Sequence, residues 1–376
     1  MRIGVSGLQP STIKAVAGDG EEAETDVPTG RLCGDSERQA TVPPTADGGP
    51  PGASDIDEAD AVALFVEPPV SPRRSRRVAK LEPRMLVTFW GVRGSVPVPG
   101  ADTLAFGGNT SCLEVRAGRA LLIFDAGTGL RMLGRKLVHE GPIDAHLFFS
   151  HVHWDHIQGF PFFEPAFIAG NTITLYGGSH VSRTLEETLA GQMHRPHFPV
   201  HLEDLDATMR FVEIADDRVV MLDDGAGGHV EVRATRGNHP DGVWAFRVDH
   251  GGASVMYATD TEPDASIDAD LVRLAGGVDV LVCDAQYTPE EYAGTVGHGG
   301  SKVGWGHSTF VAATELARVA GAKRLLLFHH DPAQSDADVR EKERRARELF
   351  AAAHAAYEGL TIDLARDLAR EPEPPG

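Results

Sequence analysis

The sequence predicts an α/β fold in which β-sheets are covered by helices, and two observations support this prediction. After residue 84, short apolar strands come first, and strand and helix patterns then alternate towards the C-terminus. Such an order is typical of sheets with helices packed outside them. In addition, five of the predicted strands end in a residue that can bind a metal ion, and ligands of α/β proteins bind beyond the carboxyl ends of the strands.

Short apolar runs bounded by turn residues predict the strands, and apolar residues at helical spacing predict the helices. Strands are expected at residues 86–90, 112–115, 121–124, 145–150, 173–176, 209–214, 229–234, 243–248, 254–258, 278–283 and 324–328. Helices are expected at residues 130–137, 181–193, 267–274, 308–319 and 336–356, the last of them long and charged.

The chain of 376 residues is long enough for two domains, or for one large domain with a tail. Residues 1–84 are rich in Pro, Gly and acidic residues and predict a disordered tail. Met85 opens the first convincing strand, so an alternative translation start at Met85 is also open. Residues 85–366 are expected to form one globular domain, and residues 367–376 a second disordered tail.

The formal net charge of −20 argues against a protein that neutralises the phosphates of a long nucleic acid, so no strong nucleic-acid-binding patch is expected. A small anionic substrate remains open, because metal ions supply positive charge locally. The three cysteines suit neither a disulfide framework nor a Cys-type zinc site. No apolar run approaches the ~20 residues that cross a bilayer. We therefore expect a cytoplasmic protein that does not enter a membrane.

Metal-binding residue types gather directly after the predicted strand at residues 145–150. They are His151, His153, Asp155 and His156. Residues two apart in extended backbone point the same way, so His151 and His153 can bind one ion while Asp155 and His156 reach a second. Imidazole nitrogen and carboxylate oxygen suit Zn²⁺ and similar ions. A histidine-rich surface turn is the alternative, and the spacing after an apolar strand favours the metal site.

Further ligand-type residues end the other strands. Five such residues each lie at the end of a predicted strand or in the turn beside it: Asp125, His151, Asp260, Asp284 and His329. Each residue alone could be a capping aspartate or a histidine of the core. Together they indicate one shared rim at the carboxyl ends of the strands.

The pattern His-x-His-x-Asp-His at residues 151–156 resembles the hallmark of the metallo-β-lactamase superfamily of metal-dependent hydrolases. The resemblance is closest to the branch that holds ribonuclease Z and related phosphodiesterases, and it runs from residue 85 to the last helix. The other segments that carry it are Asp125-Ala126-Gly127, Asn238-His239-Pro240, Thr259-Asp260-Thr261, Gly306-His307-Ser308-Thr309 and Phe328-His329. It implies a four-layer αββα sandwich of two mixed sheets flanked by helices.

The resemblance also implies two divalent metal ions, with Zn²⁺ favoured and Mn²⁺ as the alternative. The first ion would be held by His151, His153 and His239, the second by Asp155, His156 and His329, and Asp260 would lie between them. Two ions about 3.5–4 Å apart would hold a bridging water and lower its pKa, so that hydroxide attacks the substrate. The choice of His329 over its neighbour His330 rests on the resemblance.

The Gly-His-Ser/Thr segment implies a catalytic histidine, His307, that donates a proton to the leaving group, with Asp284 orienting it and Asp155 shared between catalysis and metal binding. Alternatively, His307 and Ser308 cap the helix that follows. Residues predicted to contact the substrate are Asn109, Phe162 and Ser308. Phe162 could stack on a base or belong to the core.

These inferences favour a dinuclear metal-dependent phosphodiesterase for small anionic phosphodiesters, such as a cyclic nucleotide or a short oligonucleotide. A tRNA 3′-end-processing endonuclease is an alternative, although no long basic insertion is present to grip tRNA. A hydrolase of a lactone, thioester or β-lactam keeps the same fold. A regulatory scaffold with an idle metal site is the alternative that is not an enzyme. A homodimer is compatible with each of them.

Overall fold

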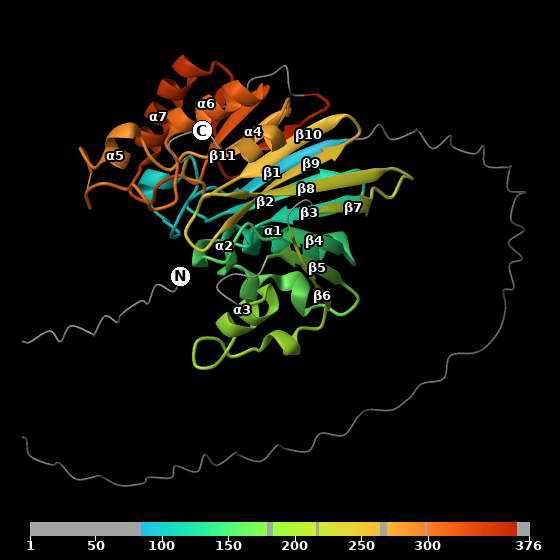
Figure 1. Ribbon diagram of the computed structural model, residues 1–376. Coiled ribbons are helices and arrows are strands. Elements are labelled where there is room, and N and C mark those ends of the chain that lie inside the picture. The colour runs from blue at the N-terminus through green and yellow to red at the C-terminus, as the bar shows by residue number, and fades with distance from the viewer. Residues whose placement is uncertain (1–83, 179–182, 216–217, 264–268, 298, 367–376) are drawn as a thin grey trace, which may run out of the picture. The chain divides into compact units, whose positions relative to one another are not determined.

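The computed structural model describes residues 84–178, 183–215, 218–263, 269–297 and 299–366. Within these residues, fourteen strands form two sheets of seven strands each (Figure 1). The first sheet has the order β14-β1-β2-β3-β4-β5-β6 and the second the order β13-β12-β11-β10-β9-β8-β7. The strands are β1 Met85–Gly91, β2 Cys112–Ala117, β3 Ala120–Phe124, β4 Asp144–Phe148, β5 Thr172–Gly177, β6 Thr208–Glu213, β7 Val219–Asp223, β8 His229–Gly237, β9 Val243–His250, β10 Ala253–Ala258, β11 Val280–Asp284, β12 Arg324–Phe328, β13 Ala353–Ala355 and β14 Thr361–Asp363.

Helices cover the outer faces of the two sheets. The α-helices are α1 Gly129–Leu137, α2 Trp154–Ile157, α3 Leu185–Gln192, α4 Ala269–Ala275, α5 Pro289–Ala293, α6 Phe310–Ala320 and α7 Asp336–Leu349. The short 3₁₀ helices are η1 Ala101–Thr103, η2 Val138–Glu140, η3 Phe160–Phe162, η4 Glu164–Phe167 and η5 Leu202–Asp204. Helices α1 and α3 contact the first sheet, and α4, α6 and α7 contact the second (Figure 1). The predicted αββα sandwich of mixed sheets is confirmed.

Both sheets are mixed, and the parallel part of each sheet leads to the same region. Strands β3, β4, β5 and β6 run parallel in the first sheet, and β10, β11, β12 and β13 run parallel in the second. The remaining pairs are antiparallel. Parallel neighbours end at the same edge of a sheet, so the residues that follow β3 and β4 lie together, as do those that follow β10, β11 and β12.

Three hydrophobic layers hold the sandwich together. Aromatic rings fill the space between the sheets, including those of Phe124, Phe148, Phe246, Tyr257 and Phe328. A second layer joins the first sheet to the leucines of α1, and a third joins the second sheet to α4 and α6. Burying one such side chain contributes about 1.5–3 kcal/mol. Strands β3, β11 and β12 are buried on both faces, which is why they are apolar except for Asp284 at the end of β11 and Arg324 at the start of β12.

The helix predicted at residues 336–356 is too long. Helix α7 ends at Leu349, and the Ala-rich segment after it turns into β13, where Ala353 pairs with Leu325 of β12. Pairing with a buried strand outweighs the helical preference of alanine. The short elements β7, β14 and α5 were not predicted either, because segments of three to five residues carry little periodicity.

The predicted tails fall outside the described residues, except for Arg84, whose guanidinium binds the Asp363 carboxylate. The starts of the helices predicted at residues 181–193 and 267–274 also fall outside them. None of the helices in the described ranges combines the length and apolar character needed to span a bilayer. Cys112 and Cys283, both described, are free and buried.

Candidate metal centre

Three residues within two positions of a strand end adopt a left-handed backbone conformation at the rim of the sandwich. Asp125, Asp260 and His329 have φ angles of 60°, 49° and 59°. Residues other than glycine seldom adopt this conformation, which costs about 1–3 kcal/mol and is concentrated at functional sites. The surrounding buried strands impose it here. The strained backbone therefore marks the place where the two sheets bring their polar residues together.

The first group of possible ligands consists of His151, His153 and His239. One nitrogen of each ring lies within 4.8 Å of the others. The His239 Nδ1–H donates to the carbonyl of Gly306 at 2.7 Å, so its Nε2 lone pair faces His153 Nδ1, 3.1 Å away. His151 Nδ1 lies 3.1 Å from Ser150 Oγ, and His151 Nε2 is buried without a hydrogen-bond partner. A buried, unpaired imidazole nitrogen is the atom that a metal ion would satisfy.

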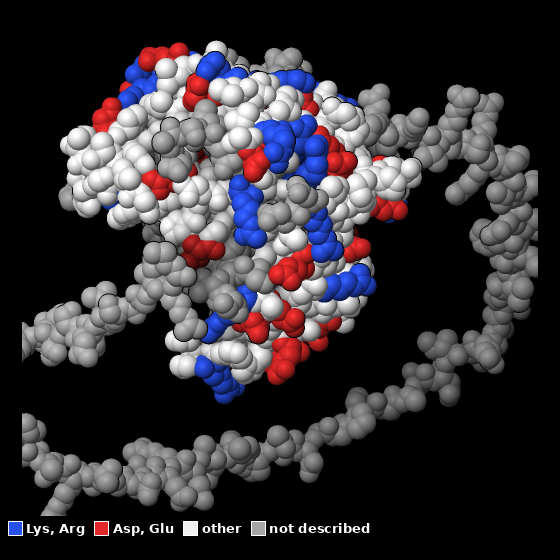
Figure 2. All heavy atoms as spheres, in the orientation of Figure 1, with Lys and Arg blue, Asp and Glu red and all other residues white. Residues whose placement is uncertain are grey.

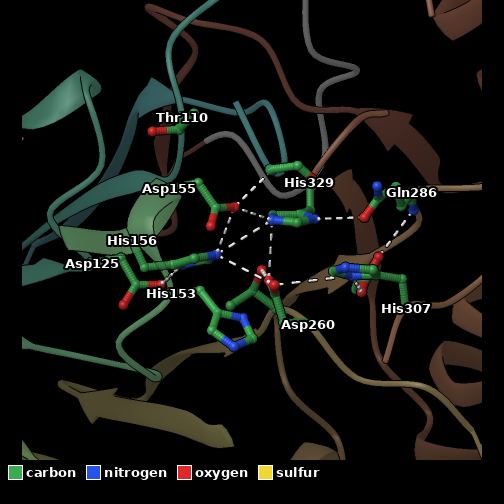
Figure 3. Close-up of polar contacts among 12 residues, drawn as sticks. Thr110, Asp125, His153, Asp155, His156, Asp260, Gln286, His307 and His329 are labelled. Atoms are coloured by element: carbon green, nitrogen blue, oxygen red, sulfur yellow. Dashed lines mark hydrogen bonds and ion pairs between the residues drawn. The ribbon is translucent and has the colours of Figure 1, made fainter. Parts of the chain in front are cut away.

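The second group consists of Asp155, His156, Asp260 and His329. His156 Nδ1–H donates to Asp125 at 2.7 Å, and His329 Nδ1–H donates to Gln286 Oε1 at 3.1 Å. The Nε2 atoms of both rings therefore carry lone pairs, and they lie 3.3 Å apart. Figure 3 shows both rings turned towards Asp155 and Asp260. Two imidazole nitrogens and two carboxylates that converge in this way could hold a divalent cation between them.

Asp260 lies between the two groups. Its Oδ2 is 3.3 Å from His156 Nε2, 3.6 Å from His151 Nε2 and 3.9 Å from His239 Nε2, and its Oδ1 is 3.2 Å from His329 Nε2. One carboxylate thus lies close to possible ligands of both groups, and its role as a bridge between two ions stays a prediction.

The electrostatics of the site suit a divalent cation. Burial lowers the pKa of His151 well below its usual value. Burial opposes ionisation of Asp260, but His329 and His156 outweigh it and hold the pKa of Asp260 well below its usual value. His151 is therefore neutral and Asp260 ionised, the forms that bind metal. Imidazole nitrogens and carboxylate oxygens are the donors that Zn²⁺ and similar divalent ions take.

Asp125 supports the ligands from behind. Its carboxylate accepts hydrogen bonds of 2.7 Å each from Ser150 N, Ser150 Oγ, His156 Nδ1 and Tyr257 Oη. Tyr257 belongs to β10 of the second sheet, Ser150 lies in the loop after β4 of the first sheet, and His156 lies in α2. Asp125 thereby sets the orientation of the His156 ring and connects the two sheets under the site.

His307 and Asp284 form a pair beside the second group, and together with Asp260 and His329 they make a third set of residues that could hold an ion. His307 Nδ1 lies 3.1 Å from Asp284 Oδ2, and the His307 ring stacks 5.0 Å from that of His329. Burial opposes protonation of His307, but Asp284 outweighs it and raises the pKa of His307 to about 9. Thr309 is the N-cap of α6 and accepts from Ala312 N. The alternative in which His307 and Ser308 cap this helix is therefore wrong.

A hollow of about 490 Å³ opens onto the site. Its lining is made by Ser95, Val152, His153, Trp154, Asp155, Asp260 and His307. The hollow gives a substrate access to ligands of both groups and to His307. It is within the size range of small-molecule sites.

The three residues predicted to contact the substrate do not line this hollow. The Asn109 side-chain amide donates to Glu358 at 2.9 Å, and the Ser308 hydroxyl donates to the carbonyl of Thr261. Phe162 is half exposed, and its ring packs edge-on against Phe198. A role of these residues in substrate binding stays a prediction.

Several supporting residues were missed by the sequence reasoning. Gln286 holds His329, and Ser95 N donates to Asp155 Oδ2 at 2.7 Å. Glu262 accepts from the backbone N–H groups of Gly304 and Gly306, and so holds the turn whose carbonyl orients His239. The sequence signal for this turn was the glycine at position 306. In the structure, Gly306 has φ +86°, and a Cβ there would lie 2.1 Å from His239 Nδ1. Only glycine fits at Gly306.

Comparison with known proteins agrees with this geometry. Residues 121–330, more than half of the chain, match the family described as the β-lactamase superfamily domain. A ribonuclease Z of Porphyromonas gingivalis is 28% identical over 287 residues, which cover 65% of this chain and 90% of that protein.

Two solved structures share the fold. The metallo-β-lactamase-fold protein YhfI of Bacillus subtilis has a TM-score of 0.53 and 20% identity, and the match covers 75% of this chain and 99% of YhfI. A diphosphatase of the PhnP family has a TM-score of 0.54 and 19% identity, with 74% and 97% covered. By sequence and by fold, this chain belongs to the metallo-β-lactamase superfamily of metal-dependent hydrolases.

Proposed function

We propose that this protein is a dinuclear metal-dependent phosphodiesterase that acts on small phosphodiesters, such as a cyclic nucleotide or a short oligonucleotide. The observation that carries the proposal is the His307–Asp284 pair beside two converging ligand groups. Hydrolysis of a phosphodiester needs positive charge at the phosphoryl oxygens and a proton for the leaving oxygen. The arrangement offers residues for both tasks. The name of one relative, a ribonuclease Z, points to the same bond type.

The chain provides the ligands for two ions, for which Zn²⁺ is the first choice and Mn²⁺ the second. His151, His153 and His239 would hold one ion, Asp155, His156 and His329 the other, and Asp260 both. Two bound divalent ions supply positive charge for the phosphoryl oxygens and lower the pKa of water.

His307 supplies the proton. Its Nδ1–H donates to Asp284 Oδ2, which holds the ring in place and favours the imidazolium form. The second ring proton, on Nε2, is then available in the hollow that His307 lines. As the bond between phosphorus and the leaving oxygen breaks, this proton passes to the leaving oxygen. Neutral His307 regains a proton from water before the next turnover.

The negative net charge of the chain favours a small substrate over a long nucleic acid. The chain has a net charge of −20, and on the face in Figure 2 a group of Lys and Arg side chains lies among Asp and Glu side chains. A long polyanion prefers a continuous basic surface. A tRNA-processing endonuclease is the second candidate, because of the similarity to ribonuclease Z.

A cytoplasmic location, a homodimer and the absence of a strong nucleic-acid-binding patch stay predictions.

A substrate panel tests this proposal. The purified protein, loaded with Zn²⁺ or Mn²⁺, is assayed with bis(p-nitrophenyl) phosphate, cyclic nucleotides, a tRNA precursor, a lactone, a thioester and a β-lactam. We expect hydrolysis of the small phosphodiesters to be fastest, because His307 and the ligand groups suit a phosphoryl centre.

Two results of the panel would contradict the proposal. One is activity on the carboxyl-type substrates that exceeds activity on the phosphodiesters. The other is no turnover of any phosphodiester with any divalent ion, which would favour the idle-site scaffold. Faster cleavage of the tRNA precursor than of the small diesters would replace the small substrate by tRNA.

A further inference from the structure

Trp154 occupies an unusual place in the metal-binding motif. It is the first residue of α2, between His153 and Asp155, and its side chain is 79% exposed while the Asp155 and His156 side chains are buried. Successive side chains on a helix point about 100° apart. The turn that directs Asp155 and His156 inward therefore directs the indole outward. An exposed tryptophan gains nothing from burial in this fold.

The indole of Trp154 has no structural partner within the described ranges, which sets it apart from the partly buried Trp90 and the buried Trp244. Trp90 Nε1 donates to Glu114, and the buried Trp244 ring packs against the guanidinium of Arg236. No hydrogen bond, ring contact or cation–π contact joins the Trp154 side chain to another described residue. Its side chain is therefore available for a contact with another molecule.

Trp154 forms one wall of the 490 Å³ hollow that contains the site. His153, Asp155, Asp260 and His307 line the same hollow. A phosphoryl group at the ligand groups would place the next part of the substrate against the walls of this hollow. Among the residues that line it, Trp154 offers a large flat apolar surface beside imidazoles and carboxylates.

We propose that Trp154 is the stacking surface for an aromatic base on the substrate, and thus selects phosphodiesters that carry a nucleobase. This inference rests on the proposed phosphodiesterase activity. Aromatic side chains bind bases through their faces without reading the sequence, because every base has such a face. Phe162, predicted from the sequence for this role, has its ring packed against Phe198 and lies outside the lining of the hollow.

The test compares two substrates with the same leaving group. One is a thymidine p-nitrophenyl phosphodiester, and the other is its abasic analogue, in which a methoxy group replaces thymine. Trp154→Ala is expected to lower the ratio of kcat/KM between the base-bearing and abasic substrates about 10- to 100-fold, mainly through KM. Trp154→Phe is expected to retain most of the ratio, because it keeps an aromatic face. Leu104→Ala is a matched control, since Leu104 is also exposed and lies outside the hollow.

A binding measurement separates this inference from the proposed function. Calorimetry with thymidine monophosphate and deoxyribose phosphate measures the contribution of the base without any turnover. If neither substrate is hydrolysed, the proposed function fails, and loss of the base-dependent affinity in Trp154→Ala still supports the stacking surface. Equal losses for both ligands, no loss in Trp154→Ala, or a loss confined to Phe162→Ala would each overturn the assignment to Trp154.

Discussion

Replacing His307 by alanine is expected to lower kcat for phosphodiester hydrolysis about 10²- to 10⁴-fold, the usual contribution of a general acid. The reason is the proton that His307 delivers to the leaving oxygen. A good leaving group such as p-nitrophenoxide departs without that proton, whereas an alkoxide does not. The loss should therefore be smaller for a p-nitrophenyl ester than for an ester that releases an alcohol. Steady-state kinetics on the two esters measure this difference.

Asp284→Asn is the matched variant for His307→Ala. Asp284 raises the pKa of His307, and activity that needs the protonated ring is lost as the pH rises through that pKa. Without the carboxylate charge the pKa of His307 falls, so the alkaline limb of the pH–rate profile should move to lower pH. Equal losses for both leaving groups in His307→Ala would contradict the proton-donor role. Loss of bound metal in that variant would assign His307 to the ligands instead.

Replacing Asp125 by alanine is expected to destabilise the metal-free protein by about 3–5 kcal/mol, as for a buried charged group that loses its partners. The Ser150 N–H, the His156 imidazole and the Tyr257 hydroxyl would lose their acceptor in a dry interior. Because Asp125 also orients His156, metal affinity should fall about 10- to 100-fold. Urea unfolding measures the first effect, and competition with a zinc-binding dye measures the second.

Tyr257→Phe provides the matched control for Asp125→Ala. It removes one of the four hydrogen bonds to Asp125 and keeps the ring between the sheets. We expect a loss of about 1.5–3 kcal/mol, as for a hydrogen bond to a charged group, with much less effect on metal affinity. If Asp125→Ala had the same stability and the same metal affinity as the wild type, the carboxylate would not support the site.

The sequence was sufficient to predict which residues gather at the site where local spacing or the order of strands brings them together. His151, His153, Asp155 and His156 follow one strand, and Asp260 and His329 could be added because they follow apolar strands that run parallel in the second sheet. The metal-binding pattern therefore depends on features that a chain displays in one dimension. The alternation of elements predicted sheets covered by helices, whereas the arrangement of two sheets in four layers was implied by the family resemblance.

The remaining contacts depend on the folded arrangement. Gln286, Tyr257 and Ser95 reach the site from separate segments, and no spacing rule links them to the histidines that they hold or approach. Trp154 had the appearance of a spacer within the motif until its exposure and its place in the hollow were known. The left-handed backbone at Asp125 is imposed by the strands around it, and aspartate itself does not demand it.

The two-metal site is tested most directly by metal content per chain, measured by elemental analysis after removal of loosely bound ions. Wild-type protein should retain about two divalent ions, the number for which the ligand groups provide donors. His239→Ala and His329→Ala should each retain about one, because each variant loses a ligand of a different group. His194→Ala is the control and should retain both, since His194 is an exposed histidine outside the ligand groups. The two-metal site would be contradicted if the wild-type protein retained no divalent ion. It would also be contradicted if both ligand variants retained as many ions as the wild type.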